Sequence, residues 1–184
     1  MLTHQDFIDM SCMNDVNAAL ITRLPDLGLN ECYLTAGSLF QTIWNLRMRR
    51  RPTENIKDYD IFYFDEDLSW NAENDVIKRA EHAFKDLNAR IELRNQARVH
   101  CWYEKRFGHK ITPFQTTRDG IDSFLIACTC VGINVDTKEL YAPNGLGDLW
   151  DGILDINPIN PKPDLFKAKA SDYLSRWPWL TLRA

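Results

Sequence analysis

The chain has 184 residues, of which 45% are apolar and 26% charged. This length and composition are typical of a globular protein with a hydrophobic core. A formal net charge of −4 argues against a general nucleic-acid binder, although a local basic patch is compatible with it. No apolar run is long enough to span a bilayer, and the first residues lack the layout of a signal peptide. We therefore expect a cytoplasmic protein with no membrane partner.

The first part of the chain predicts helices, then a strand that turns sharply into another helix. One or two helices precede the strand, with Asn14 or Asp15 available as an N-cap between them. Residues 33–36 are a short apolar run that ends at Gly37 and Ser38, after which apolar residues recur at helical spacing. Such a turn exposes backbone N–H groups that suit a phosphate, but Gly-Ser is also common where a chain only turns and caps. Taken alone, the turn favours the second interpretation.

A basic loop and a second strand follow. Residues 47–55 contain four arginines, and Pro52 ends any helix there. Residues 58–64 are rich in β-forming side chains and predict a strand. Because residues two apart on a strand point to the same face, Asp58 and Asp60 present their carboxylates side by side. A folded protein tolerates such a pair mainly when a cation lies between the two groups.

A third carboxylate follows on the next predicted strand. Residues 69–88 predict a helix with Ser69 as its N-cap, and Glu92 then lies between apolar neighbours in an alternating segment. If that segment lies beside the strand of Asp58 and Asp60, the three carboxylates converge. Such a cluster suits Mg²⁺, typically two ions bridged by the phosphates of a substrate. The alternative is that Glu92 faces solvent and Asp58 caps a turn, and spacing alone slightly favours that alternative.

We expect the strand of Glu92 to continue to Trp102, so that its polar side chains share one face. This face carries Glu92, Arg94, Gln96, Arg98 and His100. It is too polar for a core and is either a solvated edge or the floor of a site; we favour the site because Leu93, Val99 and Tyr103 give the strand a separate buried side. Arg94 and Arg98, together with Lys57, are then suited to holding a triphosphate. Gln96 and His100 become candidate substrate contacts.

The C-terminal part predicts a hairpin over residues 131–142 and a last helix over residues 164–176, followed by Trp177 and Trp179. The six tryptophans are more typical of packing than of a base-stacking platform. The five cysteines, an odd number in apolar segments, predict free thiols and no disulfide. The sequence contains no zinc-ligand spacing, hydrolase elbow or phosphate-binding glycine motif, so an all-carboxylate metal site remains the sharpest option.

These motifs resemble the DNA polymerase beta-like nucleotidyltransferase superfamily. The resemblance rests on the Gly37-Ser38 turn, on Asp58 and Asp60 in the next strand, and on Glu92 in a later one. More narrowly, the chain is similar to a bacterial branch described as nucleotidyltransferase-like proteins of unknown substrate. The blocks that carry this similarity are A-G-S-L-F-Q-T-I-W-N, K-D-Y-D-I-F-Y-F-D, I-E-L-R-N-Q-A-R-V-H-C-W-Y, Y-A-P-N-G-L-G-D-L and R-W-P-W-L.

What the resemblance implies is an α/β (α+β) fold, with a mixed β-sheet flanked by helices, an NTP donor and two Mg²⁺ ions. Asp58 and Asp60 would bind both metals. Glu92 would hold one ion and orient the acceptor hydroxyl, and Gly37 and Ser38 would grip the triphosphate. We expect one domain over residues 1–184, with a core of about 30–142 and a C-terminal extension of about 143–184.

The expected reaction moves a nucleoside monophosphate from an NTP to an acceptor and releases pyrophosphate. RNA, a protein side chain or a small molecule fits as the acceptor. The spacing between Ser38 and Asp58 exceeds what is usual in the superfamily, so residues 47–55 are either a substrate-gripping loop or a sign that turn and carboxylates are not partners. The alternative from another class is a catalytically silent nucleotide- or protein-binding module, whose partner would occupy the tail with Trp177 and Trp179.

Overall fold

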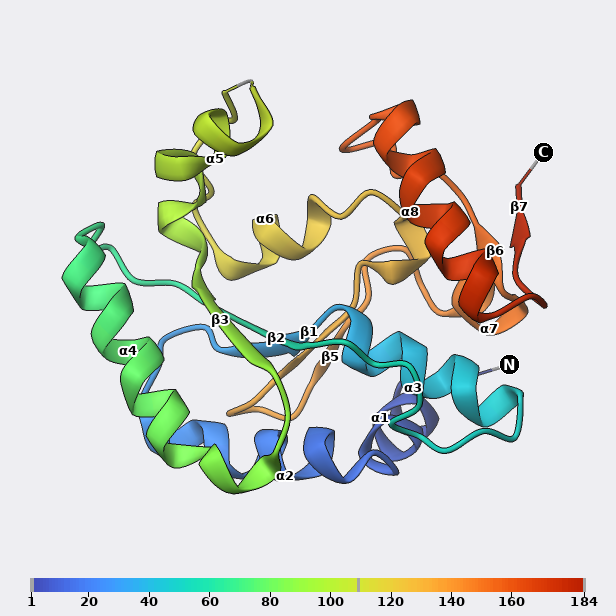
Figure 1. Ribbon diagram of the computed structural model, residues 1–184, viewed down its shortest axis with the longest axis horizontal. Coiled ribbons are helices and arrows are strands. Elements are labelled where there is room, and N and C mark those ends of the chain that lie inside the picture. The colour runs from blue at the N-terminus through green and yellow to red at the C-terminus, as the bar shows by residue number, and fades with distance from the viewer. Residues whose placement is uncertain (1, 109, 184) are drawn as a thin grey trace.

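The structure, a computed structural model, describes residues 2–108 and 110–183 and contains a five-stranded mixed sheet (Figure 1). Its strands are β1 (Tyr33–Thr35), β2 (Tyr59–Tyr63), β3 (Ile91–Asn95), β4 (Gly132–Asn134) and β5 (Leu140–Tyr141). They lie in the order β3-β2-β1-β4-β5. β2 and β3 are parallel, and the other neighbours are antiparallel. The predicted mixed sheet and the predicted C-terminal hairpin are both confirmed.

Helices flank the sheet, as predicted. The α-helices are α1 (His4–Cys12), α2 (Asp15–Arg23), α3 (Gly37–Arg47), α4 (Trp70–Ala83), α5 (Val99–Phe107), α6 (Thr117–Asp122), α7 (Gly147–Asp151) and α8 (Pro163–Arg176). Short 3₁₀ segments are η1 (Leu24–Leu27), η2 (Lys85–Leu87), η3 (Gln96–Arg98) and η4 (Ala127–Thr129), and β6 (Ile153–Leu154) pairs in parallel with β7 (Thr181–Leu182). In Figure 1, α1 and α2 lie below the sheet, and α5, α6 and α8 lie above it.

Local signals set the starts of two of these helices where the sequence predicts them. The Asn14 side chain accepts hydrogen bonds from the backbone of Val16 (3.1 Å) and so caps α2. The Ser69 hydroxyl accepts one from the backbone of Ala72 (3.2 Å) and caps α4. Both caps satisfy N–H groups that a helix leaves without a partner in its first turn.

Alternation along the strands decides which face of the sheet is core. Leu34, Ile61, Leu93 and Ile133 are neighbours in the strand register and are all buried in the main hydrophobic core. The residues next to them point to the opposite face, so that Thr35, Asp60 and Glu92 form a row across β1, β2 and β3. The sheet therefore places Asp60 and Glu92 side by side in the register, but the predicted set of Asp58, Asp60 and Glu92 does not form a three-carboxylate metal site in the described part of the chain.

The continuous strand expected from Leu93 to Trp102 is wrong. β3 ends at Asn95, and the chain continues as η3 and α5. The Asn95 side chain accepts hydrogen bonds from the backbone of Ala97 (3.1 Å) and Asp65 (3.0 Å), and this capping turns the chain away from the sheet. The polar residues after Asn95 consequently do not share one strand face with Glu92.

The C-terminal extension packs on α3 through an aromatic cluster. Ring centroids of Phe40, Trp44, Tyr173 and Trp177 lie 4.7 to 6.2 Å apart in tilted and edge-to-face pairs. Trp177 is fully buried, and its indole N–H donates to Asn45 (2.8 Å). Trp177 is thus part of the core and is not accessible to a partner, whereas Trp179 is half-buried.

The loop of residues 47–55 is anchored on α3 and on the same extension. Asn45 donates to the carbonyls of Pro52 (3.2 Å) and Glu54 (2.6 Å), and Arg176 donates to the carbonyl of Asn55 (3.1 Å). These bonds satisfy buried polar groups and fix the loop against the end of α8.

Two observations concern the whole described chain. All five cysteines are free thiols, and Cys32, Cys128 and Cys130 are buried. No helix in the described ranges is long and apolar enough to cross a membrane.

Candidate functional site

A cleft of about 330 Å³ is lined by residues of β2, α3, α5 and α8. Figure 1 shows α5 and α8 on the same side of the sheet. Its acidic side is formed by Asp58 and Asp60, at and just before the start of β2, and Gly37 at the N-terminus of α3 lies beside them. The remaining wall is largely apolar and aromatic, with Phe40, Phe62, Tyr103, Phe107, Phe124, Leu125, Ile126, Leu165 and Tyr173. The cleft therefore combines a charged end with an apolar end.

The carboxylates of Asp58 and Asp60 have no hydrogen-bond or ion-pair partner among the residues that the structure describes. Burial, together with the negative charges of Asp58 and Glu92, raises the pKa of Asp60 to about 7, while Lys169 and Arg94 oppose the shift. Ionisation of Asp60 without a nearby cation therefore costs free energy, and a bound divalent cation would remove that cost.

Glu92 is beside Asp60 in the register but is held by arginines. Its carboxylate forms an ion pair with Arg90 and another with Arg94 at 3.5 Å. Within residues 2–108 and 110–183, no three Asp, Glu, His or Cys side chains form a group that could hold a metal ion. Mg²⁺ is usually bound by one or two carboxylates together with water and substrate phosphates, so the oxygen pair of Asp58 and Asp60 fits this ion.

The turn between β1 and α3 has a strained backbone at the edge of the cleft. Ala36 has φ 58° and ψ −139°, a conformation that strongly favours glycine. Gly37 also lines the cleft, and a Cβ there would lie 2.6 Å from the Gln41 amide nitrogen. The Ser38 hydroxyl is buried and has no hydrogen-bond partner in the described structure. The α3 N-terminus thus offers positive dipole and free N–H groups to the cleft.

Replacing Ala36 with glycine is expected to stabilise the protein by about 1 kcal/mol. A non-glycine residue in this region is strained by about 1–3 kcal/mol, and glycine relieves that strain. Glycine also loses more conformational freedom on folding, which offsets about 0.5–1 kcal/mol of the gain. Urea unfolding at neutral pH measures the change. Ala168→Gly, on the exposed side of α8, is the matched control and is expected to lose about 1 kcal/mol. Equal losses in both variants would contradict the assigned strain.

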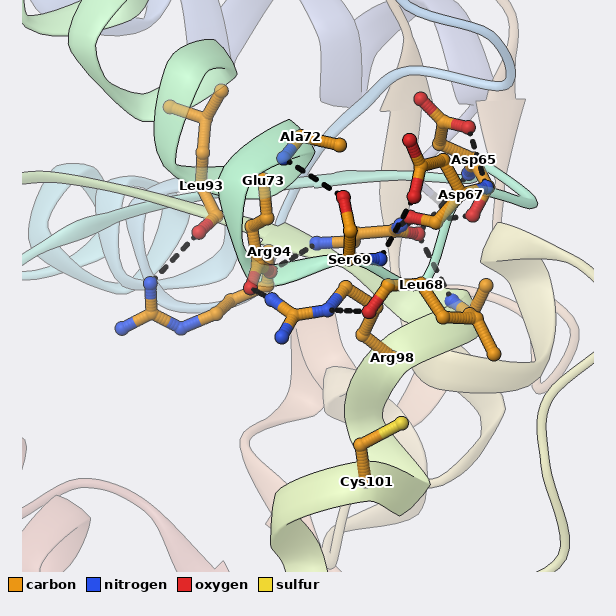
Figure 2. Close-up of polar contacts among 12 residues, drawn as sticks. Asp65, Asp67, Leu68, Ser69, Ala72, Glu73, Leu93, Arg94, Arg98 and Cys101 are labelled. Carbon is orange, nitrogen blue, oxygen red and sulfur yellow. Dashed lines mark hydrogen bonds and ion pairs between the residues drawn. The ribbon is translucent and has the colours of Figure 1, made fainter.

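The structure separates several predicted site residues from the cleft. Figure 2 shows the Arg98 guanidinium between the Glu73 carboxylate, with which it forms an ion pair, and the Leu68 carbonyl (2.9 Å). Both charged side chains are nearly buried, with exposures of 10% for Arg98 and 11% for Glu73. Arg98 therefore holds α4 and the start of α5 together and does not line the cleft.

The other basic and polar candidates also lie outside the cleft lining. Lys57 pairs with Asp172 of α8 at 3.3 Å. Gln96 is buried against Gly120, where an added Cβ would lie 2.1 Å from its amide oxygen. His100 is half-buried on α5, and its Nε2 lies 3.5 Å from the Cys101 sulfur. Their predicted contacts with nucleotide or substrate are therefore not supported by the lining of this cleft.

Lys169 is a cleft residue that the sequence reasoning missed. It projects from α8 into the lining and its charge lowers the pKa of Asp60, opposing the effect of burial. Leu165 and Tyr173 line the cleft one turn before and after it. The sequence does contain a signal for this role, because Lys169 lies four residues from both Leu165 and Tyr173 and so interrupts an apolar face of the helix. From the sequence, this helix is expected only as part of a C-terminal extension.

Comparison with known proteins defines first the class of fold and then the family. The structure is similar to a solved NMR structure described as revealing a CCA-adding enzyme head domain, with TM-score 0.77 and 25% identity over 100% of this chain and 97% of that one. This is the fold of a nucleotidyltransferase head domain. The family model described as nucleotidyltransferase matches residues 22–182, and the chain belongs to that family. A search of curated proteins gave no match.

Proposed function

We propose that the protein transfers a nucleoside monophosphate from an NTP to an acceptor in a reaction that depends on Mg²⁺. The observation that carries this proposal is the Asp58 and Asp60 pair, which lies in the cleft without a protein cation bound to it and beside the N-terminus of α3. Family membership and the shared fold support the reaction class.

The residues of the cleft have separate roles in this proposal. Asp58 and Asp60 would hold Mg²⁺, which when bound would stabilise the charge that develops on the phosphate oxygens. The backbone of Gly37 and Ser38 would bind the triphosphate through the α3 N-terminus, with Lys169 as a nearby countercharge. Arg94 is the one predicted arginine whose charge acts on Asp60.

Bond making and breaking occur at the α-phosphorus. The acceptor hydroxyl oxygen forms a bond to it, the bond to the oxygen that bridges the α- and β-phosphates breaks, and pyrophosphate leaves. Glu92 would orient the hydroxyl and take its proton, which requires the carboxylate to exchange an arginine partner for the substrate. Positioning of the two reactants in the cleft supplies much of the remaining acceleration.

Calorimetric titration tests the proposal. Purified protein is titrated with ATP, GTP, CTP and UTP, each with and without Mg²⁺, and the Asp58→Ala/Asp60→Ala variant is titrated in parallel. We expect binding that depends on Mg²⁺ and is lost in the variant. The name of the structural neighbour makes an RNA lacking a terminal CCA a reasonable first acceptor to try with the preferred NTP.

The outcomes separate the enzyme from a silent module of the same fold. Metal-dependent binding followed by release of pyrophosphate with any acceptor supports the enzyme. Binding of NTP that never leads to turnover supports the silent module. The proposal fails if no nucleotide binds, or if the double variant binds NTP with Mg²⁺ as tightly as the wild type does.

A further inference from the structure

A second groove of about 490 Å³ lies against α5 and has a basic and aromatic lining instead of an acidic one. It is formed by Arg94 of β3 and by Trp102, Lys105 and Arg106 of α5. The Arg106 guanidinium lies 5.9 Å from the centroid of the Trp102 ring, one helical turn away. Lys105 and Arg106 are exposed, and within the described ranges neither has an ion-pair partner.

The groove concentrates positive charge on an acidic protein. Residues 90–107 contain five arginines and lysines and only two glutamates, whereas the whole chain has a formal net charge of −4. Of these five, Arg98 is neutralised by Glu73 inside the protein. Of the other four, Arg90 and Arg94 share the Glu92 carboxylate, and Lys105 and Arg106 are exposed without an ion-pair partner in the described ranges. A local patch of this kind attracts an anion to one place without making the whole surface attractive to it.

The groove and the cleft share α5 as a wall. Trp102 and Arg106 face the groove, whereas Tyr103 and Phe107, the next residue after each, line the cleft. Arg94 of the groove is paired in the sheet register with Phe62 of the cleft. A ligand that lies in the groove can therefore reach the cleft by crossing β3 and β2.

The lining suits a ligand that alternates negative charge with flat rings. Phosphates are bound by arginine and lysine, and unpaired bases stack on tryptophan or on a guanidinium plane. In a duplex the bases are already stacked on one another and cannot use the Trp102 ring in this way. A single strand is thus favoured over a duplex.

We propose that the acceptor is a single-stranded nucleic acid, whose upstream nucleotides bind the groove of Arg94, Trp102, Lys105 and Arg106 while its 3′-hydroxyl enters the cleft. This inference rests on the proposed function and names its acceptor. The strand grows by one nucleotide as its 3′-oxygen bonds to the α-phosphorus of the NTP and pyrophosphate leaves. The hydroxyl proton would pass to Glu92 once that carboxylate has exchanged an arginine partner for the substrate.

Fluorescence anisotropy with short 5′-labelled oligonucleotides tests the groove directly. The probes are a single-stranded RNA, the same sequence as DNA, and a blunt RNA duplex, each measured over a range of salt concentrations. The wild type is expected to bind a single strand more tightly than the duplex. The comparison of RNA with DNA identifies the sugar that is preferred, and either preference supports a single-stranded acceptor.

Two independent variants and one control locate the binding. Lys105→Glu/Arg106→Glu is expected to weaken single-strand binding at least about tenfold and to reduce the dependence of log affinity on log salt by roughly two charges. Trp102→Ala is expected to weaken it by about fivefold to a hundredfold through loss of base stacking. The control is Lys78→Glu/Lys85→Glu, which makes the same charge change at exposed positions on α4 and η2 and should leave the affinity unchanged.

Titration of the groove variants with NTP and Mg²⁺ distinguishes failure of this inference from failure of the proposed function. If the wild type binds NTP with Mg²⁺ but binds no oligonucleotide, the acceptor proposal is overturned while the nucleotidyltransferase proposal stands. The same holds if Lys105→Glu/Arg106→Glu and Trp102→Ala both bind and extend the strand as the wild type does. Loss of strand binding in these variants, with NTP binding retained, supports the groove.

Discussion

Replacing Asp60 with asparagine is expected to abolish Mg²⁺-dependent NTP binding and, at the same time, to stabilise the protein without ligand. Asp60 is the carboxylate that burial and its two acidic neighbours affect most, with a pKa raised to about 7. In an unfolded chain the pKa of an aspartate is about 3.9. The folded state therefore keeps its proton on Asp60 over a pH range in which the unfolded state has already lost it.

The sign of the pH dependence follows from this difference. Between about pH 4 and pH 7 the folded state binds more protons than the unfolded state, so the contribution of Asp60 to stability falls as the pH rises. The loss is complete above about pH 7 and amounts to at most roughly 4 kcal/mol, at about 1.4 kcal/mol for each pKa unit. The Asp60→Asn variant has no titrating group at this position and does not lose this stability. Its free energy of unfolding should therefore exceed that of the wild type by an amount that grows from about pH 4 to about pH 7.

Thermal unfolding at several pH values and calorimetry with NTP and Mg²⁺ measure the two halves of this prediction. Asp75→Asn, at an exposed position on α4, is the matched control and should change neither quantity. Unchanged metal-dependent binding in Asp60→Asn would remove Asp60 from the metal site. A stability gain that does not depend on pH would show that the raised pKa is not its cause.

Removing the Glu73 side chain is expected to destabilise the fold by about 3–5 kcal/mol, the usual cost of leaving one partner of a buried ion pair alone. Glu73→Ala leaves the Arg98 guanidinium without its carboxylate (Figure 2). It also removes the acceptor for the backbone N–H of Asn95 (2.9 Å). The pair joins α4 to the end of β3 and the start of α5, so the loss is expected in global unfolding. Urea denaturation at neutral pH measures it.

Two further variants show what this ion pair does. Asp86→Ala removes the exposed ion pair between Arg23 and Asp86 and is expected to cost much less, because water screens that pair. Arg98→Met should also destabilise the protein but leave NTP affinity unchanged at a temperature where it is folded. A selective loss of NTP affinity in folded Arg98→Met would return Arg98 to the nucleotide site.

Short-range signals made much of the fold predictable. The Gly37 turn, the caps at Asn14 and Ser69, and the alternation around Asp60 depend on neighbours within a few residues. The β3 boundary was not predictable from alternation, because the Asn95 side chain caps a 3₁₀ turn while the alternation of polar and apolar residues continues past it. Local hydrogen bonds of one side chain overrode the period of the strand.

The candidate site also has one part that was predictable from the sequence and another that was not. The carboxylate pair was predictable from spacing alone, which places Asp58 and Asp60 on one side of β2, and both line the cleft. The cations near this pair depend on the packing of distant elements, because a long side chain such as Arg98 pairs with the carboxylate that packing brings close, here Glu73 on α4. Lys169 reaches the cleft for the same reason, since α8 folds back over the sheet from more than a hundred residues later in the chain. Spacing fixes neighbours along one strand, whereas the contacts between distant elements depend on how the whole core packs.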